Sequence, residues 1–116
     1  MKRSFRLTRS VDFKRVRLSG KSYAHPLVLL YVAFSDQPGR RVGVSAGLAV
    51  GNAVKRNRAK RLLRAAIRDF LPEIHPGTDL LLIARSPLPQ ADLTKTREAI
   101  SALLKRAGLL SPSYDG

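Results

Sequence analysis

The stretch that organises this chain is NAVKRNRAKRLLRAAIR, which runs from Asn52 to Arg68. Its period predicts a helix that begins near Asn52 or Ala53 and ends before Pro72. At about 100° per residue, the apolar side chains form one stripe that can pack on a core. This stripe comprises Ala59, Leu62, Leu63, Ala66, Ile67 and Phe70. We therefore expect a helix that docks onto the rest of the protein by one face.

The other face of this predicted helix is cationic. The run contains seven basic side chains and no acidic one, so its charges repel each other unless a polyanion neutralises them. Lysine and arginine release counterions when they bind phosphates, and arginine adds bidentate contacts and stacking on bases. The face carries Asn57, Lys60, Arg61, Arg64 and Arg68, and Arg56 and Arg58 flank it. This pattern is typical of a phosphate-binding helix.

The composition of the whole chain supports a nucleic-acid partner. The 116 residues carry a formal charge of +14 with a pI near 11.5, and the charge is clustered. Eight basic residues lie in the first 21 positions; with the central run they make 15 of the 22 lysines and arginines. The longest apolar run, residues 27–34, is too short to span a bilayer, and there is no cysteine or secretory signal. We expect a soluble, monomeric, cytoplasmic protein.

The remaining segments predict a single domain over residues 1–110. Residues 1–9 are expected to be a basic arm and residues 111–116 a disordered tail. A short helix is expected between its N-cap Ser10 and Gly20, with an apolar and a basic face. Strands are predicted over residues 27–34 and 41–45, joined as a hairpin, and over residues 79–85. A last helix follows, capped by Asp92 or Thr94. With two or three strands before the central helix, the order predicts a partly parallel sheet with helices on one face.

An enzyme site built from protein side chains is not indicated. The eight carboxylates are scattered over turns, caps and element ends, with no spacing typical of a metal site or a catalytic pair. His25 and His75 each precede a proline, which favours a turn role for both. The chain also lacks a phosphate-cradling glycine loop. We therefore assign no catalytic and no metal-binding residue to the protein.

The sequence allows two interpretations of the Tyr31 side chain. Strand alternation places Leu29, Tyr31 and Ala33 on one face, and an entirely apolar set on the other. The apolar set suits a helix-covered core, so the face of Tyr31 is the more open one. Tyr31 is either a core residue or a platform on which an unpaired nucleotide stacks.

Four blocks of this sequence, in order, resemble the protein subunit of bacterial ribonuclease P. The most specific is GNAVKRNRAKRLLR, residues 51–64, which matches that family's Arg-Asn-Arg helix. Asp12-Phe13 followed by Val16 resembles its first helix. RVGVS, residues 41–45, and LIAR, residues 82–85, resemble two of its strands. The resemblance covers roughly residues 3–107.

The resemblance implies an α+β fold: a two-layer α-β sandwich like domain 2 of ribosomal protein S5, with a left-handed β-α-β crossover, an exception to the usual hand. It implies that a partner RNA is the catalyst, that Mg²⁺ is held mainly by that RNA, and that the protein is the non-catalytic subunit that helps to remove the 5′ leader from precursor tRNA. The residues implied to bind the catalytic RNA are Asn52, Lys55, Arg56, Asn57, Arg58, Lys60, Arg61, Arg64 and Arg68. Those implied to bind the leader are Phe13, Lys14, Arg17, Tyr31 and Ser45.

The chain departs from the family pattern at three places, and three rival functions remain. Leu48 and Ala49 stand where many members are basic, Arg17 stands where many are aromatic, and His25-Pro26 lacks an arginine that some members have. The rivals are a ribosomal or general RNA-binding protein, a DNA-binding module that places the basic helix in the major groove, and a self-sufficient nuclease. No DNA partner is expected, because the residues before Asn52 do not form a convincing helix-turn.

Overall fold

The computed structural model describes residues 10–35 and 39–110. The predicted arm and tail and the middle of the first turn lie outside these ranges. The main elements are α1 (Ser10–Ser19), β1 (Lys21–Ala24), β2 (Val28–Phe34), β3 (Arg41–Ala46), α2 (Ala53–Arg68), β4 (Thr78–Ala84) and α3 (Leu93–Arg106). Short 3-10 turns at Leu48–Val50, Leu71–Glu73 and Leu88–Gln90 connect them. No helix within the described ranges is long and apolar enough to cross a membrane.

The four strands form one mixed sheet in the order β1-β2-β4-β3. The pairs β1–β2 and β2–β4 are antiparallel, whereas β3 and β4 are parallel and are connected through α2. The predicted α+β fold and the partly parallel sheet are therefore confirmed. The prediction left two or three strands open before α2, and the third is β1, a short and mostly exposed strand.

The predicted hairpin between β2 and β3 is wrong, because β4 lies between these two strands. The physical reason is the composition of β4. From Leu80 to Ala84 its side chains are apolar on both faces, and all residues of the strand but Ile83 are buried, so it occupies the centre of the sheet. β3 carries Arg41 and Ser45, which are only partly buried, and it forms an edge. Sequence neighbours usually pair, but here burial of the most apolar strand overrides that tendency.

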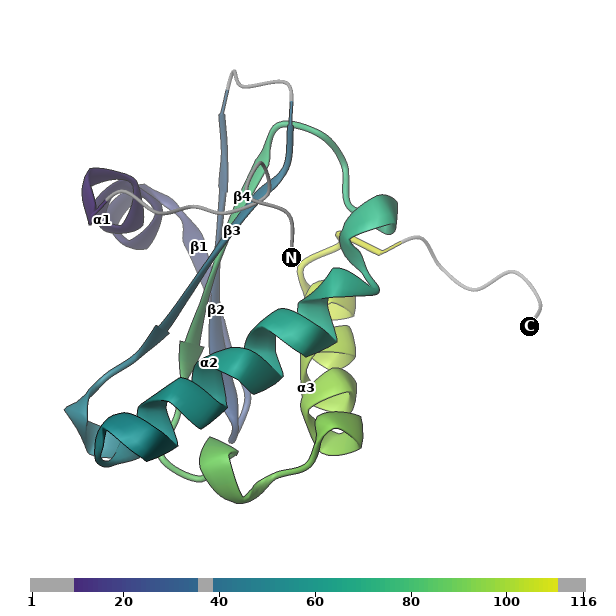
Figure 1. The fold of residues 1–116 in the computed structure, drawn as a ribbon. Coiled ribbons are helices and arrows are strands. Elements are labelled where there is room, and N and C mark those ends of the chain that lie inside the picture. Colours follow the sequence, from purple (N-terminus) through teal and green to yellow (C-terminus); the bar gives the residue numbers. More distant parts are fainter. Residues whose placement is uncertain (1–9, 36–38, 111–116) are drawn as a thin grey trace.

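Helices cover both faces of the sheet, not one as the sequence predicted (Figure 1). α2 and α3 pack together on one face and enclose the main core with the inward side chains of the strands. The predicted stripe of α2 faces this core: Ala59, Leu63, Ala66 and Ile67 are buried, and Leu62 and Phe70 pack against its edge. α1 lies on the opposite face against β2 and β4, over a small cluster of Val16, Ala33 and Leu81.

Side-chain caps fix where α2 and α3 begin. Asn52 is the N-cap of α2, and its Oδ1 accepts a hydrogen bond of 3.0 Å from the backbone N–H of Lys55. Gly51 precedes it at φ +135°, a conformation that side chains disfavour. Asp92, one of the two predicted caps of α3, accepts a 2.8 Å hydrogen bond from the N–H of Lys95. Both helix starts thus agree with the sequence.

Gly20 follows α1 for a different reason from the one predicted. Its φ is not positive, so it is not a left-handed helix cap. A Cβ at this position would lie 2.5 Å from the carbonyl oxygen of Val16 and 2.6 Å from that of Val32. Glycine therefore allows the end of α1 to approach the backbone of β2 closely. This contact helps to set the position of α1 on the sheet.

Candidate nucleic-acid interface

α1 has two faces with different tasks. At about 100° per residue, Asp12, Arg15, Val16 and Ser19 share one side of the helix, and Phe13, Lys14, Arg17 and Leu18 share the other. On the first side Val16 is fully buried. On the second, Leu18 keeps 76% of its surface exposed although it is apolar. The predicted apolar face is present, because Phe13 packs on the same small cluster as Val16. Of the predicted basic face, Lys14 and Arg17 are exposed, whereas Arg15 pairs with Asp79 of the sheet.

The second side of α1 forms one wall of a cleft of about 520 Å³. The opposite wall and the floor come from β2, β3 and β4. The cleft is lined by Phe13, Lys14, Arg17, Leu18, Tyr31, Ser45, Leu81 and Ile83. All five residues implied to bind the leader are among them, although they come from three separate elements. The structure thus brings together the residues that the resemblance selected from the sequence.

The floor of the cleft consists of side-chain rows that cross the sheet. Register places Tyr31, Leu81 and Gly43 in one row across β2, β4 and β3. The next row contains Leu29, Ile83 and Ser45. In both rows the β3 position is small, so the cleft has space beside β3 while Tyr31 stands on its β2 side. An apolar floor with an aromatic ring at one edge can accept a stacked base.

The structure answers the question left open for Tyr31. Its side chain is half-buried on the face covered by α1, where it packs against the small cluster of Val16, Ala33 and Leu81 and also lines the cleft. Phe13 has the same two contacts from the helix side. Both rings are therefore partly core and partly cleft surface, so the two readings of Tyr31 are not exclusive.

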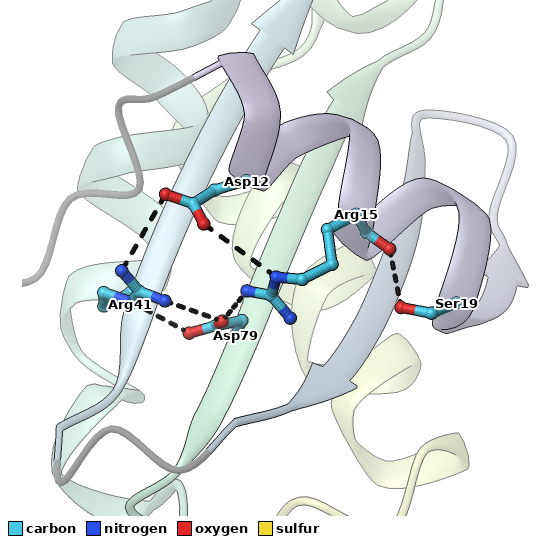
Figure 2. A network of polar contacts seen from close by, with 5 residues as sticks. All are labelled: Asp12, Arg15, Ser19, Arg41 and Asp79. Carbon is cyan, nitrogen blue, oxygen red and sulfur yellow. Dashed lines mark hydrogen bonds and ion pairs between the residues drawn. The ribbon is translucent and has the colours of Figure 1, made fainter.

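A partly buried ionic network joins α1 to the sheet beside the cleft (Figure 2). Asp79 of β4 is fully buried, and both its oxygens accept hydrogen bonds from Arg41 of β3, 3.1 Å from Nε and 3.0 Å from Nη2. Arg15 of α1 donates to the same carboxylate from the other side. Asp12 completes the cluster: its Oδ1 lies 3.8 Å from Nε of Arg15, and its Oδ2 lies 4.0 Å from Nη1 of Arg41. The hydrogen bond with Asp79 is the main cause that raises the pKa of Arg41.

This network determines which cations near the cleft are available to a ligand. The two arginines and two aspartates of the network cancel in formal charge. Lys14 and Arg17 are exposed, line the cleft and form no ion pair with any residue in the described ranges. A phosphate in the cleft therefore meets the charges of Lys14 and Arg17 first.

Sequence reasoning missed the network and part of the cleft lining. No sequence pattern singles out Leu18, Leu81 or Ile83 as cleft residues, and Asp12 and Asp79 stand in the sequence among carboxylates scattered over element ends. Alternation in β4 was a usable signal, because it places Asp79, Leu81 and Ile83 on one face of the strand. The pairing of Asp79 with Arg41 had no such signal, since it depends on β3 lying next to β4.

The cationic face of α2 points away from the sheet. Asn57, Arg61, Arg64 and Arg68 follow one another at helical spacing opposite the buried stripe, and of these only Arg64 is partly buried. Lys55, also exposed, lies in the first turn, whereas Arg56 and Lys60 are partly buried. The predicted face thus exists as a continuous cationic surface along the helix.

Two of the residues implied to bind RNA also have roles within the protein. The side chain of Asn52 caps α2, as described above. Arg58 donates from Nε to the carbonyl oxygen of Pro89, at 2.7 Å, and thereby ties α2 to the turn before α3. Both side chains therefore contribute to the fold, and the remaining members of the set are the stronger candidates for direct phosphate contacts.

The described residues do not fit a Mg²⁺ site. No group of three or more His, Cys, Asp or Glu side chains in residues 10–35 and 39–110 could hold a metal ion. The carboxylates of Asp12 and Asp79 come closest to a donor set, but two arginines already occupy them. A cation would have to displace these arginines, so these two carboxylates do not form a metal site.

A small basic α+β domain with a cationic helix on one face of its sheet and an amphipathic cleft on the other has the form typical of a nucleic-acid-binding protein. Comparison with known proteins narrows this class. The family model described as Ribonuclease P matches residues 1–108, so the chain belongs to the ribonuclease P protein family, the protein component of the tRNA-processing endoribonuclease.

Relatives and solved structures agree with this assignment. The ribonuclease P protein component of Oceanobacillus iheyensis is 37% identical over 111 residues, which cover 95% of this chain and 92% of that one. That of Chloroflexus aurantiacus is 39% identical over 111 residues, which cover 95% of this chain and 82% of that one. The RNase P protein of Staphylococcus aureus has the same fold with a TM-score of 0.82 at 27% identity, covering 92% and 98%. The RNase P protein of Thermotoga maritima has a TM-score of 0.76 at 28% identity, and the match covers 87% of this chain and 96% of that one.

Proposed function

We propose that this protein binds two RNAs at once: the catalytic RNA of ribonuclease P through the cationic face of α2, and the single-stranded 5′ leader of precursor tRNA through the cleft beside α1. The observation that carries the proposal is that α2 and α1 lie on opposite faces of one sheet (Figure 1), with the cleft on the side of α1. A ligand on α2 therefore leaves the cleft open. Membership of the family supports the identity of the two RNAs.

In this proposal the protein contributes binding and not bond cleavage. The side chains of α2 neutralise phosphates of the catalytic RNA, and the cleft holds the leader by stacking on Phe13 and Tyr31 and by the charges of Lys14 and Arg17. Mg²⁺ held by the RNA would supply the Lewis acid and the activated water for hydrolysis. Extra cations on the protein reduce the repulsion between two RNAs, so less Mg²⁺ is needed for their association.

Reconstitution with a bacterial ribonuclease P RNA tests the proposal. We expect the chain to stimulate cleavage of precursor tRNA at low Mg²⁺, and to do so less at high Mg²⁺, where screening replaces the protein. The protein without RNA should not cleave. A general RNA-binding protein would bind both RNAs without stimulating cleavage, and that result would overturn the proposal.

A further inference from the structure

The ionic network beside the cleft has no part in the binding just proposed, because its charges cancel. We propose that Asp79 is a positioning residue for leader binding: through Arg15 and Arg41 it holds α1 at the position over the sheet at which both walls of the cleft contact one strand of RNA. This inference rests on the proposed function of the cleft. It assigns a role to a cluster that touches no RNA itself.

The carboxylate of Asp79 is the point at which three elements meet. It projects from β4, directly opposite Arg41 on the parallel strand β3. Arg41 takes both of its oxygens, and Arg15 reaches it from α1 (Figure 2). β4 and β3 belong to the floor of the cleft, and α1 forms its wall. The buried carboxylate of Asp79 therefore fixes α1, the wall of the cleft, relative to the strands of its floor.

The apolar contacts of α1 are too few to fix its position alone. Val16 is fully buried, but Val11 and Leu18 are largely exposed, at 58% and 76%. The cluster between the helix and the sheet has three buried members, Val16, Ala33 and Leu81, and the residues packed against it, Phe13, Tyr31 and Ile83, are only partly buried. Contacts of this kind are non-directional and allow a helix to slide or rotate. Hydrogen bonds between a guanidinium and a carboxylate have a fixed geometry, so the network selects one orientation.

Moving α1 out of that orientation costs free energy, so the helix has one preferred position. A displaced Arg15 would leave Asp79, which has almost no exposed surface, with fewer partners for its charge. One further contact acts in the same direction: Gly20 brings the end of the helix against the backbone of β2. α1 is thus held to the sheet by Arg15 and by its C-terminal end.

Rotation of α1 would be felt on its other side. Phe13 and Lys14 lie across the helix from Arg15, and they face Tyr31 and Ser45 across the cleft. Any turn of the helix that loosens Arg15 also changes the separation of these walls. A stacked base requires both rings at a defined spacing. Positioning by Asp79 therefore acts on affinity for the leader and not on affinity for the catalytic RNA.

The test compares two substrates in the reconstituted holoenzyme: precursor tRNA with a long single-stranded leader, and the same tRNA without a leader. The ratio of their affinities measures leader binding. We expect Arg15→Ala to reduce this ratio roughly tenfold, while affinity of the protein for the catalytic RNA changes by less than about twofold. Arg15→Lys should restore part of the ratio, because it returns one charged donor to Asp79.

Asp79→Asn is the second variant, with similar volume and no charge, and we expect the same loss. If it does not fold, Arg15→Ala still decides, since the Arg15 side chain is partly exposed. Arg97→Ala, which removes the exposed 2.7 Å pair with Asp69, is the matched control and should keep the ratio. An unchanged ratio in Arg15→Ala, or an equal loss of affinity for both RNAs, overturns the inference. No leader dependence in the wild type would overturn the proposed function instead.

Discussion

Arg41 and Asp79 occupy directly opposed positions on the parallel strands β3 and β4, and the guanidinium binds both oxygens of the carboxylate. Removing Arg41 would leave the buried carboxylate of Asp79 with Arg15 as its remaining cation and with Oδ1 deprived of its donor. We therefore expect Arg41→Ala to lower the free energy of unfolding by about 3 kcal/mol, measured by urea denaturation. Arg97→Ala, at an exposed pair, should cost less than about 1 kcal/mol.

The pH dependence of this effect follows from the direction of the pKa shift. Asp79 raises the pKa of Arg41 above its ordinary value, mainly by accepting its hydrogen bonds. A raised pKa gives stability that is fully present below the unfolded value and is lost only as pH rises through the folded value. The loss in Arg41→Ala should thus be equal at about pH 6 and about pH 9. A loss that falls between these values would mean that another group titrates in the network.

Gly20 is predicted to be intolerant of any side chain. In Gly20→Ala the new Cβ would overlap the carbonyl oxygens of Val16 and Val32, and both are backbone atoms that cannot move aside cheaply. We expect a loss of about 2 kcal/mol or more in the free energy of unfolding. Gly47→Ala is the control, because its Cβ would meet no atom within 4 Å and its φ is −84°. Equal effects of the two substitutions would show that α1 does not approach β2 as closely as the structure has it.

Two asparagines at the start of α2 are predicted to separate folding from binding. Asn52→Ala removes the N-cap, so it should lower the free energy of unfolding by about 1 kcal/mol. Asn57 is exposed on the cationic face, and Asn57→Ala should leave stability within about 0.5 kcal/mol of the wild type while weakening RNA binding. Thermal denaturation and RNA affinity of both variants check this. The reverse assignment would be supported if Asn52→Ala altered affinity alone.

The local features of this fold were predictable, because they depend on residues close in sequence. The start and stripe of α2 follow from helical period and a capping asparagine, and the cap of α3 follows from Asp92. The order of the strands was not, since the insertion of β4 between β2 and β3 is decided by burial across the whole sheet. The side of the sheet chosen by α1 likewise depends on a contact between Val16 and residues far along the chain.

The same distinction applies to the candidate site. The cationic face of α2 could be derived from one helix, whereas the cleft combines residues of α1, β2, β3 and β4 that no local pattern connects. Resemblance to the family selected five residues that line this one cleft, and their role in leader binding stays a prediction. The pairing of Asp79 with Arg15 spans 64 positions and leaves no periodic trace in the sequence.

The salt dependence of assembly is predicted to report on α2. Each phosphate neutralised in a duplex contributes about 0.9 to the slope of log affinity against log salt concentration, and in a single strand about 0.7. Arg61→Ala with Arg64→Ala should therefore weaken binding of the catalytic RNA and flatten this slope by about 1.4 to 1.8. The control is Lys95→Ala with Lys105→Ala, which removes two exposed charges from α3. Equal flattening in both variants would show that net charge, and not the face of α2, determines affinity.

The last prediction concerns the cleft, where the network leaves two cations for the leader. Lys14 and Arg17 line the cleft without an ion pair to any described residue, whereas Arg15 and Arg41 are neutralised by aspartates. Lys14→Ala with Arg17→Ala should therefore flatten the salt slope of leader-dependent affinity by about 1.4, the value for two phosphate contacts in a single strand. The slope for assembly with the catalytic RNA should stay unchanged, because α2 lies across the sheet. If the double variant altered assembly and left the leader-dependent slope intact, the cleft would be a surface for the catalytic RNA, and the two faces of the sheet would have to exchange their proposed ligands.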